Sequence, residues 1–393
     1  MLKLLYFAID METNGAARLL FKHEFQKTHI MNPLNKIHEH GQSIWLDLLD
    51  RDIMVTGKLQ SRITNDDLRG LTSNPSIFEK AISGSSDYDA DIANLSKKED
   101  DNAAIFFAMA IKDIQRAADI FKPVYEKTNG KDGFVSLEVS PYLARDTEGT
   151  IEQARELWKK VNRKNVMIKI PGTREGLPAI RKCIAEGINI NITLLFGLPR
   201  YREVTEAFMG GLEERLKANK PIDEVASVAS FFLSRIDVMV DPMLEQKNAP
   251  DLKGKIAIAS AKIAYQIYLE MISGDRFKKL EAKGAQRQRL LWASTGTKDP
   301  AYSDVKYVET LIGKETINTL PVETIDAFRH HGKVADTLTK DSESATRALE
   351  GLKEIGIDIH QITQKLEEEG IEKFNQAYDK LLKSIDDKKQ QKN

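Results

Sequence analysis

One lysine interrupts a short stretch that otherwise reads as a buried strand. Lys169 lies within residues 166–170, and the two-residue alternation of a strand places it opposite the branched side chains of that stretch. If the branched residues pack on covering helices, the amine points away from them into the interior. Desolvation disfavours an ammonium there, and the neutral amine is the form that attacks a ketone carbonyl. Lys169 is therefore a candidate Schiff-base nucleophile, and a buried salt bridge to Glu138 or Asp47 is the structural alternative.

Two carboxylates stand at the ends of other predicted strands. Glu138 and Asp47 each follow a short stretch with an apolar outer face. Imine chemistry moves protons when the carbinolamine loses water, when a carbon–carbon bond breaks and when the product is reprotonated, and carboxylates can do this work. Their structural alternative is pairing with Lys169 and Arg235. A buried amine together with acids at two other strand ends favours the catalytic interpretation.

Further strand ends carry side chains suited to a polyhydroxylated and phosphorylated substrate. Arg235 and Lys298 follow the sixth and seventh predicted strands, close to the place where barrels often bind phosphate. The small-residue loop that begins at Ser294 could offer backbone N–H groups to an anion, or it could be a solvated loop. Neutral donors and acceptors that could equally be capping or turn residues are Asn74, Asn191, Thr193 and Ser230.

Alternating strands and helices would position these residues. Short apolar stretches alternate with longer stretches of helical period from Ile44 to Thr319, which predicts parallel strands joined by helical crossovers. Eight units without a Pro/Gly/Ser-rich linker favour a closed (β/α)8 TIM barrel, in which the strand ends meet at one rim. An open sheet would need a glycine-rich fingerprint after the first strand, and none follows Asp47. The predicted strands cover residues 43–47, 69–72, 134–138, 166–170, 188–193, 225–231, 289–293 and 316–320.

Helical periodicity predicts the elements that cover and extend this barrel. The second crossover, residues 101–127, is long enough for a fully packed helix, and Gly130 and Gly133 supply the turn that follows it. After Thr319 we expect extra C-terminal helices that pack back on the barrel. They are predicted over residues 322–331, near residues 342–353, and in a last helix with an apolar face formed by Ile371, Phe374, Tyr378, Leu382 and Ile385.

The strongly patterned part of the sequence begins next to Met31. We therefore predict one barrel domain over residues 31–393, including the C-terminal helices, and an N-terminal extension over residues 1–30. A peripheral helix within residues 1–30 is the alternative. Residues 4–9 are apolar, but this run is far too short to cross a bilayer, so we expect no membrane partner.

Composition excludes several classes of function. The 58 Lys and Arg residues nearly balance 59 Asp and Glu residues, and no segment concentrates basic with aromatic residues, so we expect no nucleic-acid partner. The single cysteine, Cys183, excludes an intrachain disulfide and favours a reducing, cytoplasmic compartment. His38 and His40 point to different faces of a predicted helix, so we expect no metal and no cofactor. The sequence leaves a homo-oligomer open.

Five segments of the chain resemble the motifs of transaldolase. In order along the chain they are residues 43–47 (SIWLD), 72–76 (TSNPS), 136–141 (SLEVSP), 167–173 (MIKIPGT) and 189–196 (NINITLLF). The likeness runs from about Asn32 to the last helix. It implies an enzyme of the pentose phosphate pathway that converts sedoheptulose 7-phosphate and glyceraldehyde 3-phosphate reversibly to erythrose 4-phosphate and fructose 6-phosphate.

The resemblance also implies a role for each candidate residue. Lys169 would be the Schiff-base lysine, Asp47 the acid/base at carbon–carbon cleavage, and Glu138 an acid/base acting through a water that Thr193 helps to hold. The dihydroxyacetone part of the substrate would be bound by Asn74, Asn191 and Ser230. Phe232 would line the pocket, and the phosphate would be held by Arg235 with Ser294.

The seventh strand departs from the better-known members of this family. Where they place a second phosphate-binding arginine, this chain has Lys298, whose point charge matches a phosphate less well than a bidentate guanidinium. Residues 292–298 (WASTGTK) resemble the longer transaldolase subgroup that also occurs fused to phosphoglucose isomerase, although these 393 residues hold no isomerase-sized segment. Whether Lys298 replaces the missing arginine stays open.

Three other functions compete with this interpretation. A lysine-dependent aldolase would use the same amine but release the three-carbon unit instead of transferring it. A metal-dependent aldolase is disfavoured because the sequence has no clustered histidines. A non-catalytic barrel that senses sugar phosphates would bind them without covalent chemistry.

Overall fold

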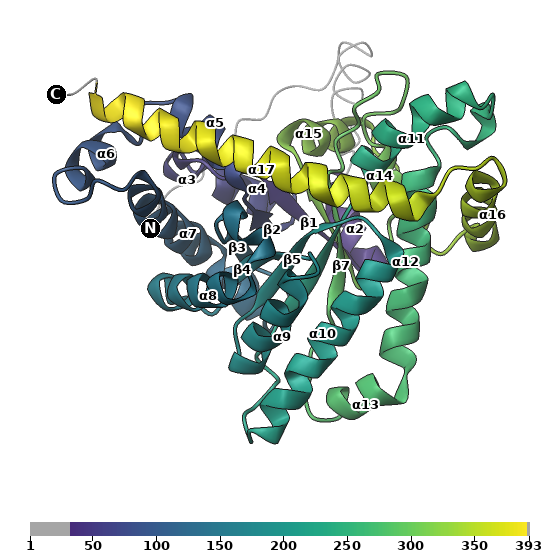
Figure 1. Ribbon diagram of the computed structural model, residues 1–393, viewed down its shortest axis with the longest axis horizontal. Coiled ribbons are helices and arrows are strands. Elements are labelled where there is room, and N and C mark those ends of the chain that lie inside the picture. The colour runs from purple at the N-terminus through teal and green to yellow at the C-terminus, as the bar shows by residue number, and fades with distance from the viewer. Residues whose placement is uncertain (1–31, 391–393) are drawn as a thin grey trace, which may run out of the picture. The chain divides into compact units, whose positions relative to one another are not determined.

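Eight parallel strands pair in chain order, and β8 pairs with β1 to close them into a barrel (Figure 1). The computed structural model describes residues 32–390 of the chain. This arrangement confirms the predicted (β/α)8 barrel. The strands are β1 (Gln42–Asp47), β2 (Leu68–Thr72), β3 (Phe134–Glu138), β4 (Val166–Pro171), β5 (Ile190–Leu195), β6 (Ser227–Phe232), β7 (Arg289–Ala293) and β8 (Thr316–Leu320).

Helices fill the connections between the strands and follow the last of them. Before and within the barrel they are α2 (Leu34–Ile37), α3 (Arg51–Val55), α4 (Lys58–Asn65), α5 (Pro75–Ser83), α6 (Asp89–Leu95), α7 (Asn102–Lys127), α8 (Thr147–Val161), α9 (Gly176–Glu186), α10 (Leu198–Lys217), α11 (Ser234–Gln246), α12 (Ile256–Ser273), α13 (Asp275–Glu281) and α14 (Lys306–Glu309). After the barrel come α15 (Val322–His331), α16 (Ser342–Glu354) and α17 (Ile359–Gln390). Short 3-10 helices are η1 (His38–His40), η2 (Pro141–Arg145) and η3 (Pro250–Leu252).

Two strands begin two residues later than the apolar pattern predicts. Ile188 donates its backbone N–H to Cys183 at the end of α9, so this residue belongs to the helix cap. Val225 likewise donates to Ile222 in a turn before β6. Both residues are buried, which explains why periodicity alone assigns them to the strands.

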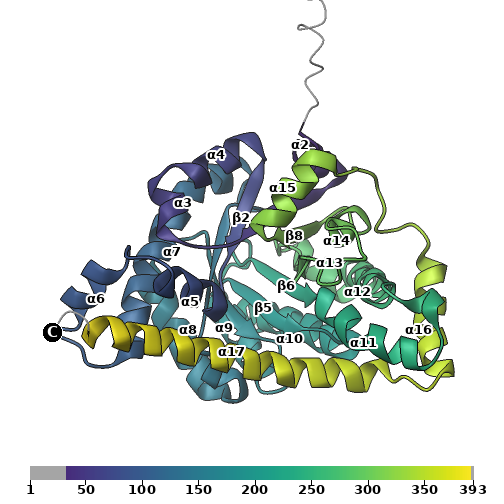
Figure 2. The same cartoon turned by 90° about the horizontal axis from the view of Figure 1, so that it is seen from above.

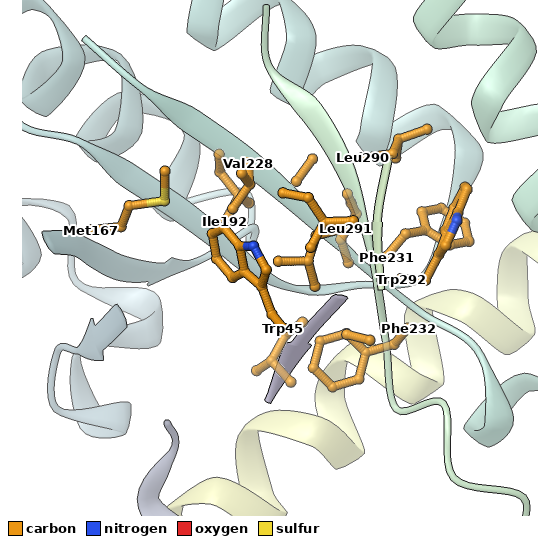
Figure 3. Packing of buried hydrophobic residues seen from close by; sticks show 14 of the residues in the cluster. Trp45, Met167, Ile192, Val228, Phe231, Phe232, Leu290, Leu291 and Trp292 are labelled. Carbon is orange, nitrogen blue, oxygen red and sulfur yellow. The ribbon is translucent and has the colours of Figure 1, made fainter. Parts of the chain in front are cut away.

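Side chains inside the barrel change from apolar to polar along the strands. Leu291 and Trp292 lie on opposite sides of β7, and Trp292 meets Phe231 edge-on outside the barrel at a centroid distance of 6.4 Å (Figure 3). Inside, the Trp45 ring occupies the space beside Gly70, where a Cβ would lie 2.5 Å from it. The inward positions nearer the carboxyl ends hold the predicted polar residues. The apolar core therefore fills the barrel on the amino-terminal side of these residues.

A buried carboxylate fastens the amino-terminal end of the barrel. Asp132 is 3% exposed and accepts hydrogen bonds from the Ser43 hydroxyl at 2.7 Å and from the Arg289 guanidinium at 2.9 Å. The Trp45 indole N–H donates to the same side chain at 3.2 Å. These bonds join β1 to β7, which lie on either side of β8 in the barrel. A fully paired network at this end is typical of a stabilising role, and the carboxyl ends remain for chemistry.

The last helix crosses the carboxyl-terminal side of the barrel. Helix α17 has 32 residues and packs on α5, α11 and the end of β5, and its long straight course is visible in a second view (Figure 2). This confirms the prediction that the C-terminal helices pack back on the barrel. Within residues 32–390, no helix combines the length and apolar character needed to cross a membrane. The predicted extension over residues 1–30 lies outside the described residues.

Candidate active site

A cavity of about 630 Å³ opens at the carboxyl ends of the strands. Its wall brings together most of the residues singled out from the sequence: Asp47, Asn74, Lys169, Ser230, Phe232, Arg235, Ser294 and Lys298. The three others, Glu138, Asn191 and Thr193, are buried next to it in the strands and are not part of its wall. The register pairs Glu138 with Lys169, and Lys169 with Asn191, so these side chains lie side by side inside the barrel.

The Lys169 amine is held by two acceptors while it faces the cavity. Its side chain is almost fully buried, and Nζ lies 3.2 Å from Oε2 of Glu138. The amine also donates to the backbone carbonyl of Ser73 at 3.1 Å. The sequence presents a nucleophile and a salt-bridge partner as alternative roles for Lys169. In the structure Lys169 both forms the ion pair with Glu138 and lines the cavity. The pair fixes the amine in place and leaves its face toward the cavity accessible.

Glu138 is an acid with an unusual environment. It is 6% exposed, and burial raises its pKa to about 6 although the neighbouring Lys169 opposes this shift. Beyond the ion pair, neither carboxylate oxygen has a hydrogen-bond partner within residues 32–390. The Thr193 hydroxyl on β5 is also buried without a partner in this part of the chain. A carboxyl group with a pKa near 6 can exchange a proton at neutral pH.

Asp47 is oriented by hydroxyl groups from the two strands next to β1. The Thr72 hydroxyl donates to Oδ1 of Asp47 at 2.7 Å, and it lies 2.8 Å from the hydroxyl of Thr319 on β8. Desolvation of the carboxyl group by the surrounding protein raises the pKa of Asp47, and the positive charge of Lys169 opposes this effect. Asp47 therefore stands at the cavity wall in a fixed rotamer, as a general acid/base needs.

The neutral residues form one chain of hydrogen bonds across three strands. Ser230 on β6 donates to Oδ1 of Asn191 at 2.7 Å, and Nδ2 of Asn191 donates to the Ser136 hydroxyl at 3.0 Å. Asn74 caps α5 by accepting from the Ile77 N–H at 3.1 Å, and it also lines the cavity. The cap therefore does not exclude the predicted contact with substrate.

Cationic and hydroxyl groups gather at another part of the cavity wall. Arg235 lies at the start of α11 with its guanidinium 5.6 Å from the Phe232 ring, and its Nη1 is buried without a partner among the described residues. Burial lowers the pKa of Arg235. Within residues 32–390, neither acid of the site pairs with it. The Ser294 hydroxyl lies 2.9 Å from that of Ser234, and Lys298 is exposed at the rim. A half-buried guanidinium with an Nη1 that has no partner among the described residues suits an anionic group in the cavity.

We expect Arg235→Met to weaken binding of a phosphorylated substrate without unfolding the protein. Losing a charge-assisted contact should raise KM for fructose 6-phosphate roughly 10- to 100-fold, with a smaller effect on kcat. Steady-state kinetics with fructose 6-phosphate and with free fructose would measure this difference. Arg200→Met is the matched control, because Arg200 already pairs with Glu203 and Glu367 away from this cavity. An equal loss for both sugars would contradict a phosphate contact.

Several residues of the cavity wall could not be assigned to the site from the sequence, and one of them, Phe374, lies beside the Lys169 amine. Phe374 of α17 lines the cavity, and its ring centroid lies 6.0 Å from Nζ of Lys169. Periodicity identified it only as part of the apolar face of the last helix. No local pattern indicates which part of the barrel such a helix covers.

Among residues 32–390, no group of three or more His, Cys, Asp or Glu side chains could hold a metal ion.

Comparison with known proteins identifies the family of the chain. Residues 44–385 match the family model described as Transaldolase/Fructose-6-phosphate aldolase. The chain is 48% identical over 372 residues to "Transaldolase" of Trichodesmium erythraeum, covering 91% of this chain and 98% of that protein. It is 48% identical to "Transaldolase 2" of a Nostoc species with the same coverage, and 43% identical to "Transaldolase" of Thiobacillus denitrificans, covering 90% and 100% of the two chains. The chain therefore belongs to the transaldolase family.

Proposed function

We propose that this chain transfers a dihydroxyacetone unit between sugar phosphates through an imine on Lys169. The donor would be sedoheptulose 7-phosphate and the acceptor glyceraldehyde 3-phosphate, giving erythrose 4-phosphate and fructose 6-phosphate in the pentose phosphate pathway. The observation that carries this proposal is the position of the amine. Lys169 is 4% exposed, held by Glu138 and Ser73, and still part of the wall of a cavity large enough for a sugar phosphate.

The first half of the reaction forms the imine. The neutral amine attacks the ketone carbon, and the carbinolamine loses its hydroxyl group as water. Glu138 would give and take the proton in this step through a water that Thr193 helps to hold. The pKa of Glu138 at about 6 supports this role, and so do the buried oxygen atoms of both side chains, which have no hydrogen-bond partner within residues 32–390.

The second half breaks one carbon–carbon bond and forms another. Asp47 would accept the proton of the hydroxyl next to the breaking bond, so that the aldose leaves and the electron pair stays on the imine-bound fragment as an enamine. An aldehyde then takes this pair, and Asp47 returns the proton to the new hydroxyl. Water then hydrolyses the iminium, which releases the ketose and restores the Lys169 amine. The raised pKa of Asp47 supports both directions of transfer, because a carboxyl group whose pKa lies closer to neutral pH can both accept and return a proton.

The remaining residues would hold the substrate. Asn191, fixed between Ser136 and Ser230, would orient the hydroxyl groups of the three-carbon unit together with Asn74. Arg235 and Ser294 would bind the phosphate, and Lys298 would add a positive charge at the rim. The cytoplasmic location and a homo-oligomeric assembly stay predictions, and the buried thiol of Cys183 is compatible with the first.

Borohydride reduction tests the covalent step directly. Treating the protein with fructose 6-phosphate and borohydride should convert the imine to a stable secondary amine, which peptide mass spectrometry would locate on Lys169. The sample without sugar is the control. An active enzyme whose Lys169 peptide stays unmodified would overturn the proposal.

Two further experiments test the competing functions. Full activity after EDTA treatment would dismiss a metal-dependent aldolase. Product analysis with and without an acceptor aldose phosphate would separate transfer from simple cleavage.

A further inference from the structure

Helix α17 contributes an aromatic side chain to the site formed by the barrel strands. Phe374 is 4% exposed, lines the cavity and places its ring centroid 6.0 Å from Nζ of Lys169. The same amine pairs with the carboxylate of Glu138 and donates to the backbone carbonyl of Ser73. The ring is therefore an apolar surface beside the atom on which the imine would form.

The segment of α17 that carries the ring is packed against the barrel on both sides of Phe374. One turn before it, Gly370 lets the α17 backbone approach β5 so closely that a Cβ would lie 2.9 Å from Leu194 Cδ2. Leu194 itself adopts a positive φ of 55°, which is costly for a non-glycine residue. One turn after Phe374, the Tyr378 ring packs on Phe106 at a centroid distance of 5.8 Å. A side chain carried by a helix segment that is packed on both sides of it can exclude solvent from a defined place.

We propose that Phe374 determines the fate of the enamine by shielding it from water. This inference rests on the proposed Lys169 mechanism. In transfer, the enamine carbon forms a bond to the aldehyde carbon, and the aldehyde oxygen takes a proton. In release, the same carbon takes a proton from water, and a second water then attacks the iminium carbon. The carbon–nitrogen bond breaks, and free dihydroxyacetone leaves while Lys169 regains its amine. An apolar ring beside the nitrogen keeps water away and so disfavours release.

The inference predicts a change in the ratio of two products. Phe374→Ala should raise the rate of dihydroxyacetone release from fructose 6-phosphate without acceptor, relative to the rate of transfer to erythrose 4-phosphate, by at least about tenfold. Phe374→Leu, which keeps apolar volume, should give a smaller increase. Enzymatic assay of free dihydroxyacetone and of sedoheptulose 7-phosphate would measure both rates.

Ile385→Ala is the matched control for helix packing. Ile385 lies on the same face of α17, three turns beyond Phe374, is 0% exposed, and is absent from the cavity wall. Its loss should lower the melting temperature and leave the product ratio near that of the wild type. If both alanine variants change the ratio equally, or if Phe374→Ala leaves it unchanged, Phe374 has only a packing role. If Phe374→Ala does not fold, the Phe374→Leu ratio decides.

Borohydride trapping separates this inference from the mechanism on which it rests. The Phe374→Ala protein should still form the reduced adduct on Lys169. An adduct with an unchanged product ratio would refute the shielding role alone. A wild-type protein without any adduct on Lys169 would refute the imine mechanism itself.

Discussion

Replacing Lys169 by arginine should abolish turnover while the barrel stays folded. A guanidinium remains charged at every accessible pH and cannot form an imine, so kcat should fall by roughly 10⁴-fold or more. The ion pair with Glu138 can persist, because the positive charge is kept next to the carboxylate. A coupled assay for glyceraldehyde 3-phosphate would measure the loss, and the circular dichroism spectrum would report the fold.

The same substitution at another lysine of the cavity provides the control for Lys169→Arg. Lys80 of α5 lines the cavity but is exposed, and within residues 32–390 it has no ion pair like that between Lys169 and Glu138. Lys80→Arg should therefore keep activity within a few-fold of the wild type. Substantial turnover in the Lys169→Arg protein would mean that the imine forms elsewhere or not at all.

The fold was predictable because its pattern repeats. Each strand is short and apolar, each crossover has helical period, and a closed parallel barrel is the arrangement that buries all of them. Topology then brings the carboxyl ends together, so Asp47, Glu138 and Lys169 could be assigned to one site although long stretches of chain separate them. Boundaries were less certain where a buried cap residue such as Ile188 continues the apolar pattern.

Details of the site depend on contacts that leave no trace in local sequence. The acceptor of the Lys169 amine at Ser73 is a backbone carbonyl, which every residue possesses. The position of Phe374 depends on the path of α17 across the barrel, which no periodicity specifies. The sequence also presented the salt bridge and the nucleophile as alternatives for Lys169. The raised pKa of Glu138 shows why they are compatible, since this carboxylate can leave the ion pair by taking a proton near neutral pH.

Glu138→Gln should lower kcat and change its dependence on pH. The amide keeps the shape of the side chain but cannot accept a proton, so we expect kcat to fall roughly 10²- to 10⁴-fold. Burial raises the pKa of Glu138 to about 6, so the carboxylate is the main form above pH 6 and the neutral acid below it. If catalysis needs the carboxylate, wild-type kcat falls as the pH drops through about 6, and this decline is absent from the Glu138→Gln profile.

Glu323→Gln controls for the loss of any negative charge at the cavity. Glu323 of α15 lines the same wall but is exposed, so its variant should keep both the rate and the decline near pH 6. Measuring kcat with saturating substrates between pH 5 and 8, roughly the range in which a group with this pKa titrates, would compare the three proteins. A decline that persists unchanged in Glu138→Gln would assign it to another group. The pKa of Asp47 is also raised, so the pH profile of Asp47→Asn would then show whether Asp47 is the group responsible.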